Sequence, residues 1–150
     1  MKAITKTIGD LLKTKEQIWT IAPQASVYQA LELMAEKDIG ALLVVENAKL
    51  VGIFSERDYA RKVILKGKTS RETAVSELMT QSVVFIAPEN TLEESMALMT
   101  AKHIRHLPVL DRGRLVGIVT LGDVTKKIIS EQEITIQDLE KYLTEGEYGI

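Results

Sequence analysis

The 150-residue sequence contains no cysteine, and this absence excludes several kinds of chemistry. A chain without cysteine has no disulfide framework, no thiolate nucleophile and no cysteine-based zinc site. His103 and His106 are the only residues that could offer imidazole ligands, and no inward carboxylate is identifiable beside them. We therefore expect no metal site, and a reducing compartment such as the cytoplasm is permitted.

A basic excess and long apolar runs are also missing. The formal net charge is -2, so no broad positive face is expected to attract nucleic acid or an anionic membrane. No run of about 18 apolar residues occurs, and the N-terminus lacks the apolar core of a signal peptide. These features predict a cytoplasmic protein without nucleic-acid or membrane partners.

An internal repeat organises the chain, whose 45% hydrophobic content is enough for a real core. Residues 18–64 align without a gap on residues 83–129, a shift of 65 positions. Two copies of this length are too few and too long for a solenoid, which predicts a pseudo-symmetric module of two units. The matching pairs include Ile21-Ala22-Pro23 with Ile86-Ala87-Pro88, Leu33-Met34 with Leu98-Met99, Leu42 with Leu107, Val44 with Val109, Leu50-Val51-Gly52-Ile53 with Leu115-Val116-Gly117-Ile118, Asp58 with Asp123 and Lys62 with Lys127.

Each repeat predicts a short strand, a helix, a β-hairpin and a second helix. The first helix of each repeat has apolar residues at helical spacing and opens with a capping box, Ser26-x-x-Gln29 or Thr91-x-x-Glu94. Two β-branched runs around a polar turn predict each hairpin. The expected elements are helices over 26–37, 56–65, 91–102 and 121–130, and strands over 41–45, 50–54, 106–110 and 115–119. The fold class is therefore α/β (α+β), with two β-α-β-β-α units.

The polar segment 66–73 is predicted to link the two units. We accordingly divide the chain into residues 1–66, a first unit with its N-terminal lead-in, and residues 67–130, a second unit with the linker. Residues 131–150 form a tail, with a helix expected from Thr135. Its narrow apolar stripe could pack against its own module or across a dimer.

The phrases GIFSERD (52–58) and GIVTLGD (117–123) repeat a pattern that permits two interpretations. Ser55-x-x-Asp58 and Thr120-x-x-Asp123 each place a hydroxyl and an acid where they would cap a helix. The same groups could face a ligand, because a helix N-terminus and a hydroxyl suit a phosphate. The two roles are compatible.

The ordered features of both repeats resemble those of the CBS domain, and their tandem arrangement resembles a free-standing Bateman module. The resemblance rests on the IAP entry, the I-x-x-L-x-V strand and the G-[IV]-x-[ST]-x-x-D phrase, and it covers roughly residues 8 to 130. It implies two units related by a pseudo-twofold axis, with their sheets packed together, their helices outside and two clefts between them. In similar proteins these clefts take AMP, ADP, ATP, NAD(H) or, occasionally, S-adenosylmethionine.

Binding roles in these clefts can be assigned by residue type. Asp58 or Asp123 could accept hydrogen bonds from ribose hydroxyls, and Gly122 would let a nucleotide approach the backbone. By the resemblance, each cleft takes adenine-facing walls from one unit and polar groups from the other. One set, here called the Asp123 group, joins Ile18, Trp19, Ile39, Gly40 and Ala41 to Arg105, His106, Thr120 and Asp123. The other set, here called the Asp58 group, joins Val83, Val84, Ile104 and Thr80 to Ser55, Arg57 and Asp58.

The two clefts are expected to differ, because Arg105 and His106 occupy positions equivalent to Gly40 and Ala41. Arginine suits phosphate through its fork of donors, which favours the Asp123 group as the phosphate holder. The alternative is that Arg105 and His106 are a solvated pair at a strand start, and that Trp19 belongs to the core or an interface.

The overall expectation is a regulatory module that binds an adenine nucleotide and signals by a change in its packing or in its dimer. No catalytic activity and no catalytic cofactor are expected, since no nucleophile or metal motif is evident. A homodimer is expected from the resemblance, together with an unidentified regulated protein. The alternative function is an interaction module that regulates an enzyme without responding to nucleotides.

Overall fold

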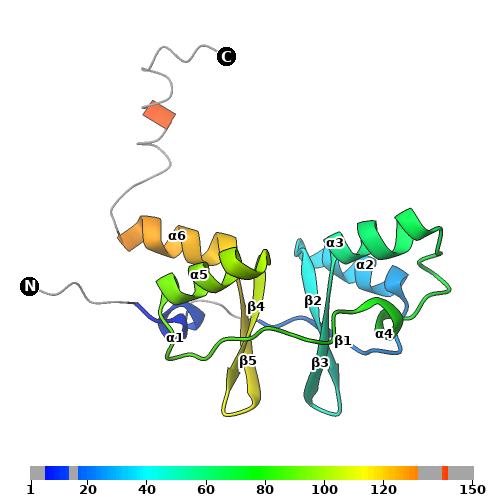
Figure 1. The fold of residues 1–150 in the computed structure, drawn as a ribbon, viewed down its shortest axis with the longest axis horizontal. Coiled ribbons are helices and arrows are strands. Elements are labelled where there is room, and N and C mark those ends of the chain that lie inside the picture. The colour runs from blue at the N-terminus through cyan, green and yellow to red at the C-terminus, as the bar shows by residue number, and fades with distance from the viewer. Residues whose placement is uncertain (1–5, 14–16, 132–139, 142–150) are drawn as a thin grey trace, which may run out of the picture.

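The structure is a computed structural model that describes residues 6–13, 17–131 and 140–141. Two mixed α and β units lie side by side, with their hairpins next to each other and helices packed around them (Figure 1). The units meet where β3 contacts β5. The predicted fold class is confirmed, while most of the expected tail helix lies outside the described residues.

The first unit has a three-stranded sheet in which β1 runs parallel to β2 and β2 runs antiparallel to β3. Its elements are β1 (Thr20–Ile21), α2 (Val27–Lys37), β2 (Ala41–Glu46), β3 (Lys49–Ser55) and α3 (Glu56–Asp58), followed by a π-helical turn η1 (Tyr59–Val63) and a 3₁₀ turn η2 (Ile64–Lys66). The single helix predicted over 56–65 is therefore divided into three kinds of turn.

The second unit repeats this order with two differences. Its elements are α5 (Leu92–Lys102), β4 (His106–Asp111), β5 (Arg114–Thr120) and α6 (Leu121–Glu131). The parallel edge strand of the first unit is reduced here to a single bridge between Ile86 and Val109. The second helix, α6, is a continuous α-helix rather than a series of turns. Similar sequences thus form similar but unequal halves.

Local sequence signals account for the starts and ends of these elements. The predicted capping boxes form at Ser26 and Thr91, each of which accepts a hydrogen bond from the backbone N–H three residues later. Both hairpins turn through two residues with positive φ, the first at Asn47 and Ala48 and the second at Arg112 and Gly113. Such type I′ turns match the right-handed twist of paired strands.

Two separate hydrophobic cores show that the halves exchange their lead-in segments. Helix α1 (Ile8–Leu12) inserts Ile8 and Leu11 into the core of the second unit, and helix α4 (Val75–Leu78) inserts Val75 and Leu78 into the core of the first. Figure 1 shows α1 beside α5 and α6, and α4 beside α2. The lead-in segment that carries α1 therefore packs on the second half, and the one that carries α4 packs on the first half. The division by sequence had placed each of them in the other half.

This exchange explains why glycine occurs in both repeated phrases. A Cβ atom on Gly52 would lie 2.6 Å from Met79 Sδ and 3.0 Å from the Thr80 carbonyl oxygen. A Cβ atom on Gly117 would lie 2.6 Å from Leu12 Cδ2. Because a real side chain needs more room than these distances leave, glycine allows the exchanged segment to cross each hairpin.

We predict that Gly52→Ala lowers the free energy of unfolding by about 1–3 kcal/mol, because the new methyl group meets a backbone oxygen that cannot move aside freely. Gly122→Ala is the control, since its Cβ would meet only Thr120 Oγ1, at 3.6 Å. Chemical denaturation measures both variants. Equal stability of Gly52→Ala and the wild-type chain would contradict the close approach.

A second prediction concerns acid sensitivity at the start of α5. The Thr91 backbone N–H donates to Glu94 Oε1 at 2.9 Å, and this bond, with the Thr91 side chain, lowers the pKa of Glu94 below its usual 4.5. The resulting stabilisation is present above pH 4.5 and is lost as the pH falls through the lowered pKa.

Glu94→Gln keeps an acceptor for the Thr91 N–H but cannot titrate, and Gln29 fills the same position in the first unit. We expect the melting temperature of this variant to fall less than that of the wild type between pH 7 and about pH 3. Glu93→Gln, on the same helical turn, should keep the wild-type profile. Identical acid profiles for Glu94→Gln and the wild type would show that the capping carboxylate does not contribute.

Candidate functional site

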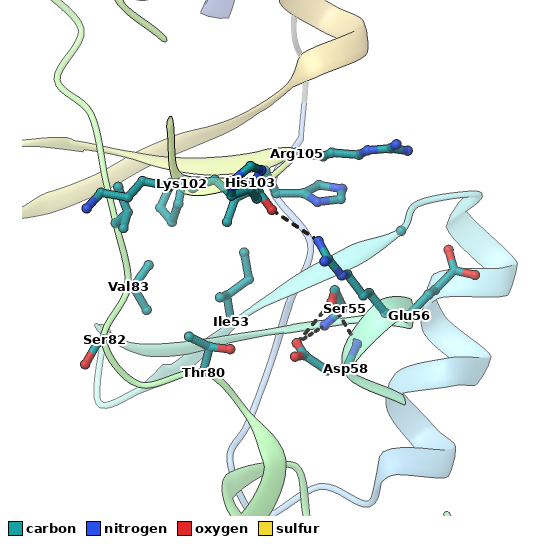
Figure 2. A pocket seen from close by; sticks show the side chains of 16 residues that line it. Ile53, Ser55, Glu56, Asp58, Thr80, Ser82, Val83, Lys102, His103 and Arg105 are labelled. Atoms are coloured by element: carbon teal, nitrogen blue, oxygen red, sulfur yellow. Dashed lines mark hydrogen bonds between the residues drawn. The ribbon is translucent and has the colours of Figure 1, made fainter. Parts of the chain in front are cut away.

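A cleft of about 860 Å³ opens between the two units (Figure 2). Its volume falls within the range of about 300–1,000 Å³ that is typical of small-molecule sites. Its walls come from Gly40, just before β2, from β3 and α3, from the segment that leads into the second unit, and from the end of α5 with the start of β4. The lining residues are Gly40, Ile53, Ser55, Glu56, Arg57, Asp58, Thr80, Ser82, Val83, Val84, Lys102, His103, Ile104, Arg105, His106 and Pro108.

The repeated phrase of the first unit forms one side of the cleft as a closed capping box. The Ser55 hydroxyl accepts from the Asp58 N–H at 3.1 Å, while Asp58 Oδ2 accepts from the Ser55 N–H at 2.9 Å and from its hydroxyl at 3.0 Å. The Glu56 N–H donates to the Gly40 carbonyl at 3.0 Å. Two amides of this first turn are thus already paired, so side chains must supply much of the binding to an anion.

The carboxylate of Asp58 is held from both of its oxygens. Oδ2 serves the capping box, and Oδ1 lies 3.2 Å from Lys62 Nζ. The Asp58 side chain is 16% exposed, which leaves it accessible from the cleft although it is mostly covered. A carboxylate fixed in this way can accept further hydrogen bonds from a ligand in one defined orientation.

Basic groups gather on the opposite side, at the end of α5. All five residues of the run Lys102-His103-Ile104-Arg105-His106 line the cleft. Arg57 reaches across from α3, and its Nη1 donates to the His103 carbonyl oxygen at 3.1 Å, as the dashed line in Figure 2 shows. These cations and imidazoles favour an anionic group on this side of the cleft.

An apolar surface completes the site between its polar sides. Ile53 and Pro108 face the cleft from β3 and β4, and Val83, Val84 and Ile104 lie beside them. The Thr80 N–H donates to the Ile53 carbonyl at 2.9 Å, which fixes this segment against the first unit. A flat apolar ring could therefore lie against one side of the cleft while its polar substituents reach the other.

The structure brings together all the residues assigned to the Asp58 group from sequence. These are Ser55, Arg57, Asp58, Thr80, Val83, Val84 and Ile104. Three residues of the Asp123 group also line this cleft, namely Gly40, Arg105 and His106. A Cβ atom on Gly40 would lie 3.6 Å from His106 Nε2, so the expected proximity of these two residues from different units is present.

The other residues of the Asp123 group lie outside the lining of this cleft. Thr120 pairs with His106 across the hairpin, and its N–H donates to Asp123 Oδ2 at 2.9 Å. Gly122 lies between Thr120 and Asp123 in the sequence, in the first turn of α6. In the first unit, Ala41 is buried opposite Ser55, and Ile18 is half-buried. Ile39 and Trp19 pack on the core, and Lys37 Nζ lies 4.2 Å from the centre of the Trp19 ring.

The grouping of basic residues therefore differs from the sequence-based one. Arg105 and His106 were assigned to the Asp123 group because each cleft was expected to combine opposite walls of the two units. In the structure they line the same cleft as Ser55 and Asp58, since the whole end of α5 faces that way. The preference for Asp123 as the phosphate holder stays a prediction, because Thr120 and Asp123 lie outside the lining of this cleft.

Sequence reasoning missed six lining residues: Ile53, Glu56, Ser82, Lys102, His103 and Pro108. A signal existed for two of them, because Lys102 and His103 directly precede Ile104 and Arg105 in one basic run. Strand alternation could also have suggested Ile53 and Pro108, because the adjacent Phe54 on β3 and Leu107 and Val109 on β4 face the cores. Glu56 and Ser82 carry no pattern that separates them from ordinary surface residues.

The paired α+β units and the cleft between them define a tandem module of two similar halves. The sequence model of the CBS domain matches residues 8–65 and 75–130, and the chain belongs to the CBS-domain family. The mitochondrial CBS domain-containing protein CBSX3 of Arabidopsis thaliana is 35% identical over 151 aligned positions, which cover 93% of this chain and 73% of that protein.

Solved structures agree with this assignment. A protein with CBS domains from Burkholderia ambifaria MC40-6 has 47% sequence identity and a TM-score of 0.83, and the match covers 87% of this chain and 99% of that one. CBSX2, solved in complex with AMP, has 31% identity and a TM-score of 0.71 over 85% of this chain and 98% of its own. Among the described residues, no helix is both long and apolar enough to cross a membrane.

Proposed function

We propose that the chain binds an adenine nucleotide in the cleft between its two CBS units and transmits this binding through a change in how the units pack. The observation that carries the proposal is the cleft itself, which joins the Asp58 carboxylate, the basic run 102–106 and an apolar wall in one space. AMP is bound by the similar protein CBSX2, which supports an adenosine ligand here.

The three parts of such a nucleotide match the three surfaces of the cleft. The base would lie against Val83, Val84 and Ile104, the ribose hydroxyls would donate to Asp58, and the phosphate would lie near Arg57 and Arg105. The bond from Arg57 to His103 already joins the two units across the mouth of the cleft. A phosphate that recruits Arg57 would alter this bond, so that ligand affinity and unit packing become linked.

The equivalent groups Thr120 and Asp123 form a second candidate site in the other repeat. Their capping box repeats two hydrogen bonds of the Ser55 and Asp58 box, from the Thr120 N–H to Asp123 Oδ2 and from the Asp123 N–H to Thr120 Oγ1, so the same ribose role is proposed for Asp123. ADP, ATP and NAD(H) are further candidate ligands. A cytoplasmic homodimer acting on an unidentified protein completes the proposal, and we assign the chain no catalytic step and no catalytic cofactor.

We expect AMP, ADP, ATP, NAD or NADH to raise the melting temperature of the wild-type chain. A ligand at about 100 times its Kd adds roughly 2.7 kcal/mol, which is a shift of several degrees for a protein of this size. Two controls accompany these ligands. Adenine alone tests whether the ribose phosphate is needed, and GMP tests whether the base is recognised. If no adenosine ligand shifts the melting temperature and a protein is captured without nucleotide, the nucleotide-independent interaction module is the better account.

Asp58→Asn tests the ribose contact directly. A hydrogen bond to a charged acceptor contributes about 1.5–3 kcal/mol, so wild type should prefer AMP over 2′-deoxy-AMP by roughly ten-fold or more. The variant should lose most of that preference, as measured by calorimetric titration of both ligands. Comparing the two ligands on one protein removes effects of the variant on stability.

Asp123→Asn is the matched variant in the other repeat, because it makes the same change at the equivalent capping position. If nucleotide occupies the Asp58 cleft, Asp123→Asn should leave the preference for AMP over 2′-deoxy-AMP at that cleft unchanged. A preference that survives in Asp58→Asn and disappears in Asp123→Asn would move the binding site to the second repeat.

A further inference from the structure

Lys62 contacts two parts of the structure at once. Its Nζ lies 3.2 Å from Asp58 Oδ1 and donates to the Leu78 carbonyl oxygen, also at 3.2 Å. The Lys62 side chain is 39% exposed, so its ammonium is partly shielded from water. Lys62 thus joins the carboxylate of the cleft to the end of α4, a helix that packs on the first core.

The local backbone favours this arrangement. Lys62 follows Asp58 by four positions and lies within the π-helical turn Tyr59–Val63. An acid and a lysine four positions apart lie on one face of a helical segment, where they can pair. Single π-turns within helices are frequently associated with functional sites. The equivalent helix of the second unit, α6, is entirely α-helical.

The carbonyl that Lys62 holds lies at the start of the route between the two units. Leu78 is the last residue of α4, and residues 79–84, here called the connector, follow it. The connector is fixed to β3 by the two hydrogen bonds between Ile53 and Thr80, of 2.9 and 3.0 Å. It then lines the cleft with Thr80, Val83 and Val84 before the chain pairs with β4 at Ile86.

We infer that Lys62 is a positioning residue that couples ligand binding at Asp58 to the connector. This inference rests on the proposed function, because it requires a nucleotide whose ribose hydroxyl donates to Asp58. A hydroxyl that donates to Oδ1 shares the oxygen now paired with Lys62 and weakens that ion pair. The ammonium then shifts relative to the Leu78 carbonyl, and the connector between the units loosens.

Hydrogen exchange of the connector tests the inference with three variants. Lys62→Met removes the ammonium while keeping an unbranched side chain, Lys62→Arg keeps a cationic donor, and Lys127→Met makes the matched change at the equivalent position of the second repeat. Without ligand, the Thr80 amide should exchange about fivefold faster in Lys62→Met than in wild type, the effect of one lost hydrogen bond. Lys62→Arg and Lys127→Met should keep the wild-type rate.

The second arm adds AMP at saturation. In wild type and Lys62→Arg, AMP should accelerate exchange at Thr80 relative to amides of the second core, whereas in Lys62→Met it should produce no such change. Binding of AMP with an unchanged connector response in Lys62→Met would overturn the coupling and leave the proposed function intact. Absence of nucleotide binding by the wild-type chain would overturn both, even if the ligand-free arm showed that Lys62 holds the connector.

Discussion

The structure depends on the crossing of each lead-in segment over the hairpin of the other half. Helix α1 completes the core of the second unit and α4 completes the core of the first, so neither half can bury its apolar face with its own repeat alone. Gly52 and Gly117 permit the crossings because they leave space where a methyl group would collide. The cleft follows from the same arrangement, since the connector must pass between the units to reach its partner.

Local features of this fold were predictable from sequence because local interactions determine them. The capping boxes at Ser26 and Thr91, the hairpin turns and the repeat register depend on residues within a few positions of each other. The complete Asp58 group also lies together, as expected from the family resemblance. Residue type and spacing therefore predicted the elements, and the resemblance predicted much of the lining of one cleft.

The remaining features depend on contacts between distant parts of the chain. No periodicity indicates that residues 8–12 pack on the second core, because an amphipathic turn fits either half equally well. The placement of Arg105 and His106 beside Ser55 and Asp58 was not predicted for a similar reason, since strand-start residues can face either side until the twist and packing of both hairpins are known. The π-turn at Tyr59–Val63 had no sequence signal that separated it from an α-helix.

These non-local features give the two repeated phrases different surroundings. The phrase that ends in Asp58 combines its capping box with a basic run from the other unit, a bridging arginine and an ion pair that reaches the connector. The phrase that ends in Asp123 forms the two reciprocal bonds of a capping box and opens a continuous α-helix. An allosteric ligand must bind two packings of the units with different affinity. The Asp58 site takes its groups from both units and from the segment between them, so it is better placed than the Asp123 site to respond to the relative position of the units.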